Sequence, residues 1–347
     1  MIEHSEIQTL KNLSNFLRCS ENLLISYLTN EVDIIDLKPN FSNEDFEKLN
    51  YSERLHSDNI CLMKFYIRKK NFLLGYRIVY TSASYFFSNM LKLLNSHFND
   101  LYLPENCVHG FVSKRNIKTN ASQHLAKKYL LSIDIKDFFE TITSQMIQVE
   151  LENLKFTKEV SEWISKLLTL NNKLVQGYNT SPTIANIVAS SMDKDFLALC
   201  KNDIIYTRYA DDLYFSSNIE LPKLEDLETI IIKHGFQLNP TKTKYMPRGS
   251  KQYVTGLSVF DQNCPRIPKR IKRNLRLELF YINKWGLQSH VLKNLGYTNE
   301  EFERSFDIQY EVSEMRQKTI FRINGWIQFI KSIELNLGIK LNKQFKY

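Results

Sequence analysis

Three aspartates stand where predicted strands end or turn. Asp134 closes the apolar run 129–135, and Asp211 and Asp212 occupy the tip of a predicted hairpin. Neighbouring carboxylates on a tight turn repel each other unless a cation lies beside them. Three carboxylates brought together by adjacent strands could hold two Mg²⁺ ions about 4 Å apart, the arrangement that supports in-line phosphoryl transfer. An aspartate-rich turn exposed to water is the simpler alternative for the Asp-Asp pair alone.

Periodicity predicts the elements that position these acids. Apolar, β-rich runs predict strands at 129–135, 204–209 and 213–217, which makes 210–212 a three-residue hairpin tip. Helical spacing predicts helices over 2–29, 84–98, 143–170, 181–200, 224–234 and from 269 onward, with breaks at Gly286, Gly296 and Gly325. The remaining assignments are a hairpin over 62–80, a strand pair over 252–260, and irregular chain or short helices over 37–59. This order predicts an α+β fold, with an antiparallel sheet covered on one face by helices.

Composition excludes several classes of protein. The chain has 347 residues, of which 43% are hydrophobic and 24% charged, as in ordinary globular proteins and unlike disordered or fibrous ones. The five cysteines are far apart and contain no Cys-x-x-Cys pair, which argues against a zinc ribbon or a disulfide framework and favours a reducing cytosol. No signal peptide and no apolar run of about 18 residues is visible. We therefore expect a cytoplasmic protein without a membrane partner.

The positive charge is concentrated in the last quarter of the chain. Residues 1–264 hold 30 Lys and Arg against 30 Asp and Glu, whereas residues 265–347 hold 16 against 8. The spacing i, i+3, i+4, i+7 places four bases on one helical face, namely Lys269, Lys272, Arg273 and Arg276. Such a face can follow the phosphates of a nucleic acid, although a solvated basic surface is the alternative.

The segments around the aspartates resemble the motifs of reverse transcriptases. Residues 209–212 (Tyr-Ala-Asp-Asp) resemble the palm hairpin of these enzymes, and Asp134 with the Phe-Phe pair at 138–139 resembles their first catalytic motif. Residues 176–182 (Gln-Gly-Tyr-Asn-Thr-Ser-Pro) resemble the motif that opens the palm helix, and residues 235–239 resemble the next motif. All of these segments occur in the expected order and at the expected spacings.

Two further segments resemble signatures of bacterial retron reverse transcriptases. These are residues 120–124 (Asn-Ala-Ser-Gln-His) and residues 254–256 (Val-Thr-Gly). The chain departs from the family where Val175 and Asn179 replace usual prolines, and where no proline follows the strand at 77–79. These departures affect loop rigidity near the nucleotide site, and so put fidelity and speed in doubt more than activity.

The resemblance implies a right-hand polymerase with fingers, palm and thumb. On this basis we expect an N-terminal helical extension over 1–60 and fingers over 61–130. The palm, with some fingers segments, is expected over 131–260, and a basic helical thumb over 261–347.

The resemblance also implies the roles of several residues. Asp134, Asp211 and Asp212 would be catalytic and would hold two Mg²⁺ ions, which Mn²⁺ could replace. The residues expected to bind the incoming nucleotide are Arg77, Phe139, Gln176, Gly177 and Lys242. An arginine fork suits a triphosphate, and an aromatic ring five residues after Asp134 would exclude a ribose 2′-hydroxyl. If the strand continues past Asp134, Phe138 points to the opposite face from Phe139, so only one of the two rings can have this role. A surface ion pair for Arg77 and a solvated position for Lys242 are the alternatives.

A second set of residues is expected to contact RNA or the template. It contains Arg115, Asn120, His124, Val254, Thr255 and Gly256, together with the four bases of the C-terminal helical face. A lone histidine is more often a structural residue with satisfied hydrogen bonds, and that alternative stays open for His124. For Arg115 a purely structural role is equally open.

The resemblance implies RNA-templated DNA synthesis on a cognate structured non-coding RNA that serves as template and primer. Synthesis would start from a guanosine 2′-hydroxyl, use dNTPs and give a multicopy single-stranded DNA joined to RNA. Partners would be that RNA and its DNA product, an effector protein in phage defence, and a host RNase H. The alternatives are an abortive-infection or group II intron type of reverse transcriptase, and a non-catalytic RNA-binding scaffold.

Overall fold

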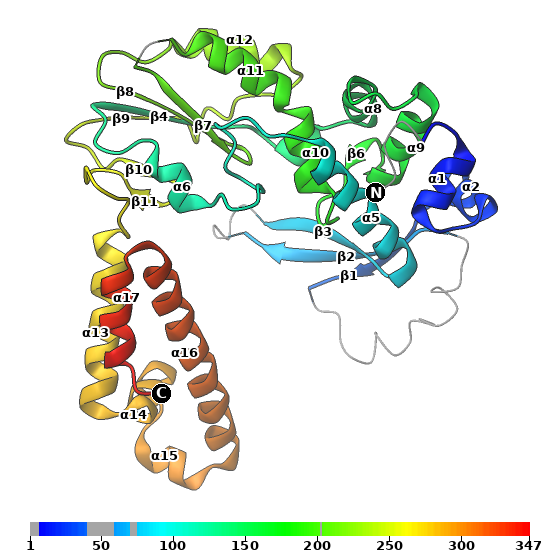
Figure 1. The fold of residues 1–347 in the computed structure, drawn as a ribbon. Coiled ribbons are helices and arrows are strands. Elements are labelled where there is room, and N and C mark those ends of the chain that lie inside the picture. Colours follow the sequence, from blue (N-terminus) through cyan, green and yellow to red (C-terminus); the bar gives the residue numbers. More distant parts are fainter. Residues whose placement is uncertain (1–6, 40–58, 70–74, 202) are drawn as a thin grey trace. The chain divides into compact units, whose positions relative to one another are not determined.

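A computed structural model describes residues 7–39, 59–69, 75–201 and 203–347. The chain divides into two compact units, each assembled from separate segments (Figure 1). The first unit contains Met1–Arg115, Leu131–Phe215 and Glu220–Lys244, and the second contains Asn116–Leu130, Ser216–Ile219 and Tyr245–Tyr347. The predicted boundaries of fingers, palm and thumb are functional divisions, and they stay predictions.

The first unit begins with two short helices and a three-stranded sheet. The elements are α1 (Leu10–Leu17), α2 (Glu21–Thr29), β1 (Asp33–Leu37), β2 (Cys61–Arg68) and β3 (Tyr76–Ser82). Strand β2 pairs in antiparallel fashion with β3, which confirms the predicted hairpin, and it pairs in parallel with β1. Most of the segment predicted to be irregular, residues 40–58, lies outside the described residues.

The sheet that carries the aspartates has four strands. Their order is β7 (Ile205–Tyr209), β8 (Asp212–Ser217), β4 (Tyr129–Asp134) and β9 (Lys244–Pro247). The predicted three-residue hairpin tip is wrong by one residue, because Asp212 already belongs to β8 and only Ala210 and Asp211 form the turn. Asp212 is therefore held by strand geometry rather than by a loop.

The first unit contains further helices after the three-stranded sheet. They are α5 (Tyr85–Leu101), α7 (Phe138–Thr141), α8 (Ser144–Asn153), α9 (Lys158–Leu168), α10 (Ser181–Val188), α11 (Ser190–Leu199) and α12 (Leu224–Lys233). Helix α11 contacts both β7 and α12, and these two helices lie along one face of the four-stranded sheet (Figure 1). This covered face agrees with the predicted α+β layering.

Two predicted helices are interrupted. The helix predicted over 143–170 is split into α8 and α9, because Lys155 adopts a left-handed φ of 72° and Thr157 caps the second helix. The last residues of the helix predicted over 143–170 instead form strand β5 (Thr169–Leu170), which pairs with β6 (Lys173–Leu174). The helix predicted over 181–200 breaks once, at Ala189.

One continuous apolar core holds the first unit together. It includes Leu13 and Leu24 of the N-terminal helices, Phe98 of α5, and Ile133 and Phe215 of the sheet, each no more than 1% exposed. Burial of large side chains of this kind contributes about 1.5–3 kcal/mol each. The N-terminal helices therefore share the core of the sheet that carries the aspartates.

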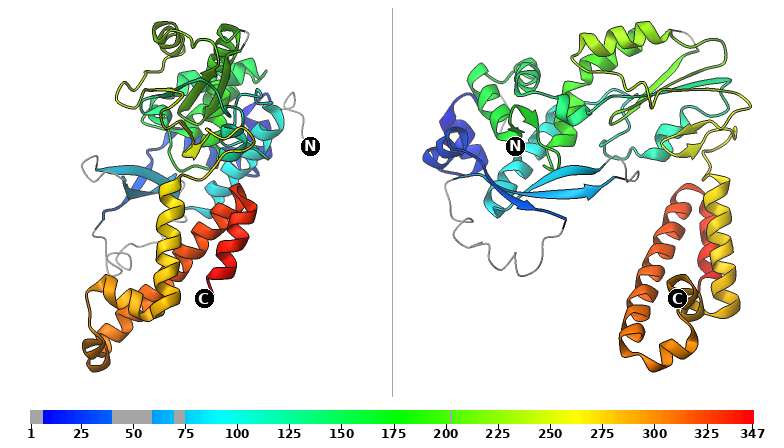
Figure 2. Two further views of the ribbon diagram at one scale, coloured as in Figure 1. Left: turned by 90° about the vertical axis from the view of Figure 1, so that its left-hand side faces the viewer. Right: turned by 180° about the vertical axis from the view of Figure 1, so that it is seen from behind.

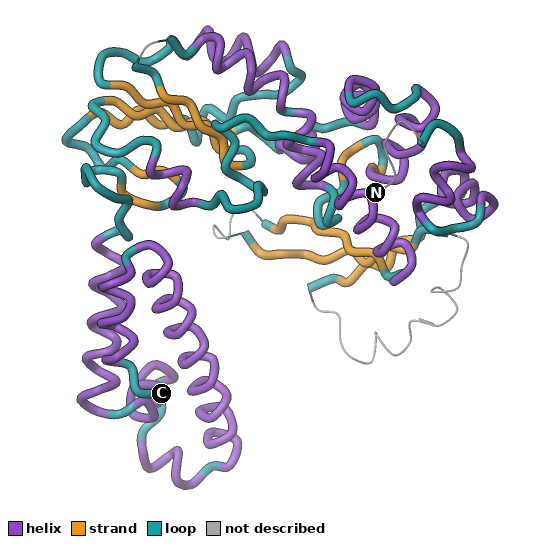
Figure 3. The backbone as a smooth tube through the Cα atoms, in the orientation of Figure 1, coloured by secondary structure: helices purple, strands orange, loops and turns teal. Residues whose placement is uncertain are grey.

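The second unit combines short β elements with a helical C-terminal part. Its elements are α6 (Ile117–Ser122), β10 (Tyr253–Val254), β11 (Leu257–Ser258), α13 (Lys269–Trp285), α14 (Leu287–Leu295), α15 (Asn299–Arg304), α16 (Phe306–Ile333) and α17 (Leu335–Gln344). From α13 onward every regular element is a helix (Figure 3). The predicted break at Gly325 is wrong, since this glycine lies inside α16.

Close packing between two C-terminal helices depends on a glycine. Helix α17 packs against both α13 and α16 (Figures 1 and 2). A Cβ atom at Gly338 would lie 2.3 Å from Lys331 Cα, so any side chain there would push α17 away from α16.

Across the residues that the structure describes, no helix combines the length and the apolar character that a membrane crossing requires.

Candidate active site

The turn between β7 and β8 is packed tightly against residues 109–110. Ala210 adopts a left-handed φ of 56°, which allows the two-residue turn. The His109 amide donates to the Arg208 carbonyl at 2.8 Å, and a Cβ at Gly110 would lie 2.5 Å from the Ala210 nitrogen. The bare glycine backbone therefore fixes the position of the turn that carries Asp211.

A buried ion pair supports the same turn from behind. Arg208 is 0% exposed and donates to the Asp193 carboxylate through Nε at 2.8 Å and through Nη2 at 2.6 Å. Its Nη1 donates to Asn186 Oδ1 at 2.9 Å and more weakly, at 3.4 Å, to the Ala210 carbonyl. Tyr206 also donates to Asp193, at 2.7 Å. No role was predicted for Arg208, Asn186 or Asp193 from the sequence; the signal of this network is an arginine inside an otherwise apolar strand.

Asp134 is brought to the hairpin turn by backbone pairing. The Ile135 amide donates to the Asp211 carbonyl at 2.9 Å. The Asp134 carboxylate, almost fully buried, accepts from Asn239 Nδ2 at 3.0 Å and from Lys242 Nζ at 2.8 Å. The structure thus places Lys242 beside the acids and adds Asn239, which was not predicted, as a second partner of Asp134.

The carboxylates on the hairpin are electrostatically strained. Burial, together with the charges of Asp211 and Asp134, raises the pKa of Asp212 to about 6. The pKa of Asp211 is also raised, by burial first and by the charge of Asp134, while Lys242 and Arg77 act in the opposite direction. A cation at this position would remove the penalty, so the chemistry of the donor set fits divalent metal ions.

The acids are not a preformed ligand cage. Within the described part of the chain, no three His, Cys, Asp or Glu side chains are grouped so that they could hold a metal ion. Both oxygens of Asp134 already accept a hydrogen bond, from Asn239 and from Lys242. An ion at Asp134 would therefore share this carboxylate with the Lys242 ammonium group.

The predicted nucleotide contacts lie in the same unit. Arg77 is exposed on β3. Its positive charge acts to lower the pKa of the Asp211 carboxyl group, so the two side chains are electrostatically coupled. The Gln176 carbonyl accepts from the Tyr80 amide at 2.7 Å, and Gly177 has a φ of 112° with room for no Cβ, which would lie 2.2 Å from the Tyr80 oxygen. The Gln-Gly segment is thus fixed against β3, the strand that carries Arg77.

The reason predicted for distinguishing Phe138 from Phe139 is wrong. The strand does not continue past Asp134, because Asp137 takes a left-handed φ of 46° and both rings lie on the short helix α7. Phe138 is nevertheless buried, with its ring 5.4 Å from that of Phe236. Phe139 is only partly buried and packs edge-on to Phe111 at 6.2 Å, so it is the ring that remains accessible.

Comparison with known families agrees with this geometry. The family described as "Reverse transcriptase (RNA-dependent DNA polymerase)" matches residues 67–298, more than half of the chain. The chain belongs to this family. The match includes every residue placed in the active site above.

Curated relatives of this reverse transcriptase family member are retron enzymes. It is 32% identical over 204 residues to the retron Mx162 reverse transcriptase of Myxococcus xanthus, covering 48% of this chain and 42% of that protein. It is 31% identical over 177 residues to the retron Ec86 reverse transcriptase of Escherichia coli, covering 50% and 55%. The alignment with the retron Ec73 reverse transcriptase of Escherichia coli is longer, with 27% identity over 78% of this chain and 83% of that protein. The predicted resemblance to bacterial retron reverse transcriptases is confirmed, although the chain spans about half the length of the first two relatives.

The two segments that resemble retron signatures pack against each other in the second unit. Helix α6, which carries Asn120, contacts β10 and β11, and Thr255 Oγ1 donates to the Ile117 carbonyl at 3.1 Å. Asn120 and Val254 are fully buried, and Gly256 takes a φ of 81° in the turn. These positions favour a structural role for the signatures, and RNA contact by their residues stays a prediction.

His124 and Arg115 are also engaged internally. His124 is fully buried, with Nδ1 lying 2.7 Å from Ser216 Oγ. Arg115 Nη1 donates to the carbonyls of Glu105 and Val108, both at 2.6 Å. Both placements favour the structural alternatives, because neither polar group points freely into solvent.

The predicted basic face of α13 is only partly available to a nucleic acid. Lys269, Arg273 and Arg276 are exposed. Lys272 instead donates to Glu334 at 3.0 Å, and the same carboxylate accepts from the Ile267 amide at 2.8 Å. The role expected for Lys272 therefore needs correction, since its charge ties α13 to the start of α17.

Proposed function

We propose that this protein is an RNA-directed DNA polymerase that converts a cognate structured non-coding RNA into single-stranded DNA. The observation that carries the proposal is the convergence of Asp134, Asp211 and Asp212 at the β4 and β8 ends, within a chain of the reverse transcriptase family. Two Mg²⁺ ions, or Mn²⁺ in their place, would be held by these three carboxylates and would stabilise the attacking and leaving oxygens of nucleotidyl transfer.

The other residues of the site have complementary tasks in this proposal. Arg77 approaches the acids from β3 and would bind the triphosphate through its guanidinium fork. Lys242 neutralises Asp134 in this structure. If a bound cation compensated the charge of Asp134, the Lys242 ammonium group would be free to donate a hydrogen bond to the departing pyrophosphate. The accessible ring of Phe139 would pack against the sugar and exclude a 2′-hydroxyl.

A primer-extension assay tests this activity. The purified protein should extend a primer on an RNA template with dNTPs and Mg²⁺, and omission of the metal or of the RNA should stop synthesis. A protein that binds RNA but extends no primer under Mg²⁺ or Mn²⁺ would contradict the proposal. That outcome would favour the alternative of a non-catalytic RNA-binding scaffold.

The retron relatives support a finer proposal about substrate and context. We infer that the template and primer are one non-coding RNA, that synthesis starts from a guanosine 2′-hydroxyl, and that the product is multicopy single-stranded DNA. An effector protein in phage defence, a host RNase H and a bacterial cytoplasmic location complete this proposal. Sequencing of nucleic acid that co-purifies with the protein tests it, because a short DNA branched from RNA is expected and unbranched nucleic acid would contradict it.

A further inference from the structure

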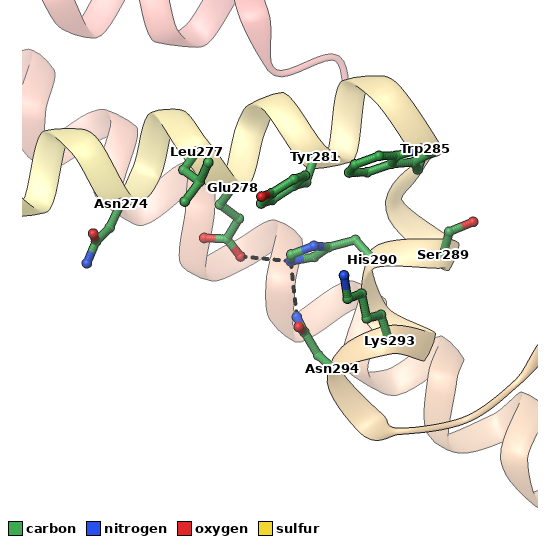
Figure 4. Close-up of a pocket in the computed structure, with 9 residues that line it drawn as sticks. All are labelled: Asn274, Leu277, Glu278, Tyr281, Trp285, Ser289, His290, Lys293 and Asn294. Carbon is green, nitrogen blue, oxygen red and sulfur yellow. Dashed lines mark hydrogen bonds and ion pairs between the residues drawn. The ribbon is translucent and has the colours of Figure 1, made fainter.

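A groove lies between α13 and α14 of the second unit, and none of the residues that line it was assigned a role above. Its volume is about 670 Å³, within the range of sites that bind small organic groups. Figure 4 shows Tyr281 and Trp285 of α13 on one side, with His290 and Lys293 of α14 facing them. The two neighbouring helices therefore form the two walls of this groove.

The wall from α13 is an exposed aromatic platform. Tyr281 and Trp285 are one helical turn apart, and their rings stack with centroids 5.1 Å apart and planes inclined by 18°. Trp285 is 52% exposed and Tyr281 36%. Leu277, one turn earlier, is 49% exposed and extends the apolar surface. A paired, solvent-exposed ring surface of this kind matches the flat face of another aromatic ring.

The charges in the groove favour an anionic ligand. Of the described residues that line it, Glu278 is the single acid, and its carboxylate is bonded to Arg322 Nη1 at 3.0 Å and lies 3.2 Å from His290 Nε2. Lys293 reaches into the groove from α14 (Figure 4). Lys284 Nζ lies 4.6 Å from the centre of the Trp285 ring. The carboxylate is thus neutralised, and ammonium groups border the platform.

The groove also continues a basic helix. Arg270, Arg273 and Arg276 are exposed on the N-terminal half of α13. Arg273 precedes Leu277 by four residues, so it lies on the same face as the platform. A strand whose phosphates follow these arginines can place a base on the rings that follow.

We infer that the groove binds an unpaired nucleotide of single-stranded RNA, with the base stacked on Trp285 and Tyr281 and the adjoining phosphate on Lys293. The choice of RNA rests on the proposed function. Aromatic stacking is the usual means by which proteins hold unpaired bases, and it tolerates any base sequence. An apolar peptide would use the rings but would leave the row of arginines and lysines unmatched.

Binding of a fluorescent oligouridine by the full chain tests this inference without requiring catalysis. Trp285→Leu should weaken binding by roughly 5- to 100-fold, the range that loss of one stacked base produces, and Trp285→Phe should recover most of the loss. The slope of log affinity against log salt should stay unchanged in Trp285→Leu, but should fall by about 0.7 in Lys293→Gln, because only the lysine contacts a phosphate. RNA carrying 5-iodouridine should cross-link to Tyr281 or Trp285.

Phe321→Leu is the matched control, since Phe321 is 74% exposed on α16 and lies outside the groove. Equal affinity of Trp285→Leu and the wild type, or equal losses in Trp285→Leu and Phe321→Leu, would overturn the inference and leave the groove to a protein partner.

Primer extension by the same preparations separates the proposed polymerase activity from the proposed nucleotide groove. Stacking without any extension would contradict the polymerase alone, and extension with unchanged oligouridine binding in Trp285→Leu would contradict the groove alone.

Discussion

Arg208 and Asp193 form a doubly hydrogen-bonded ion pair in which neither side chain has any exposed surface. The pair joins α11 to β7 directly behind the turn of Ala210 and Asp211. Because the guanidinium also bonds Asn186, both charges are matched on several sides. We interpret the pair as the support that positions the turn carrying Asp211.

The first prediction concerns this pair. Asp193→Asn should lower the free energy of unfolding by about 3–5 kcal/mol, because it leaves the arginine charge buried without its counter-charge. Chemical denaturation measures the change. Glu162→Gln, which removes the exposed pair with Lys166, is the control and should change stability by less than about 1 kcal/mol. Similar small effects in both variants would show that the buried pair is not needed for the fold.

The second prediction concerns metal and proton binding at Asp212. Its pKa is about 6 in the folded chain and near 3.9 when unfolded, so the folded state binds more protons between these values. The ionised carboxylate therefore destabilises the folded state. This destabilisation disappears as the pH falls from above 6 to about 4, because the carboxylate becomes protonated. In EDTA at pH 7.5, Asp212→Asn should be more stable than the wild type by about 1–3 kcal/mol, and the difference should vanish near pH 4.

Magnesium should reverse this order. Addition of Mg²⁺ should raise the melting temperature of the wild type, because the ions bind the folded state, and should have little effect on Asp212→Asn. DNA synthesis should be abolished in Asp211→Asn and in Asp212→Asn. Near-normal extension by both variants would mean that the active site has been assigned to the wrong residues.

The third prediction concerns the choice of sugar. Phe139→Ala should raise incorporation of ribonucleotides relative to deoxynucleotides, since a packed ring excludes a hydroxyl more strictly than an unsatisfied pocket does. Phe138→Ala should instead cost about 3–5 kcal/mol of stability, because its ring is buried. Single-nucleotide extension and thermal denaturation of both variants decide the assignment, which fails if only Phe138→Ala relaxes selectivity.

The fourth prediction separates the bases of α13. Arg273→Gln and Arg276→Gln should each reduce the salt dependence of RNA binding by roughly 0.7–0.9 in slope, with little change in stability. Lys272→Gln should show the opposite pattern, with lower stability and a nearly unchanged slope, because its ammonium group is bound to Glu334. A common response of all three variants would contradict the division.

The sequence predicted the positions of the three aspartates better than it predicted the side chains that hold them in place. Local spacing located Asp134, Asp211 and Asp212, because a strand end and a hairpin tip are encoded within a few residues. It could not show that Lys242 bonds Asp134, or that Lys272 bonds Glu334, since these partners are far apart in the chain. Pairing of this kind depends on tertiary packing, and a charge pattern on one helix cannot reveal which of its members are already neutralised.

The predicted fold failed where a single backbone angle redirects the chain. An alternating pattern through 138–139 assumed that β4 continues, whereas the left-handed Asp137 starts α7. The same applies to Lys155, which divides one predicted helix into two. Gly325 shows the reverse case, because a glycine that breaks an isolated helix is tolerated in α16, where the flanking Ile323 and Ile327 are buried.

The shared core of the first unit has a consequence for how this protein can be shortened. Leu13 and Leu24 belong to the same buried cluster as Phe98 and Ile133. A truncated chain starting at residue 61 would expose the apolar side of α5 to water and would be expected to aggregate. The N-terminal helices are thus an inseparable wall of the first unit, and any minimal version intended for engineering has to keep them.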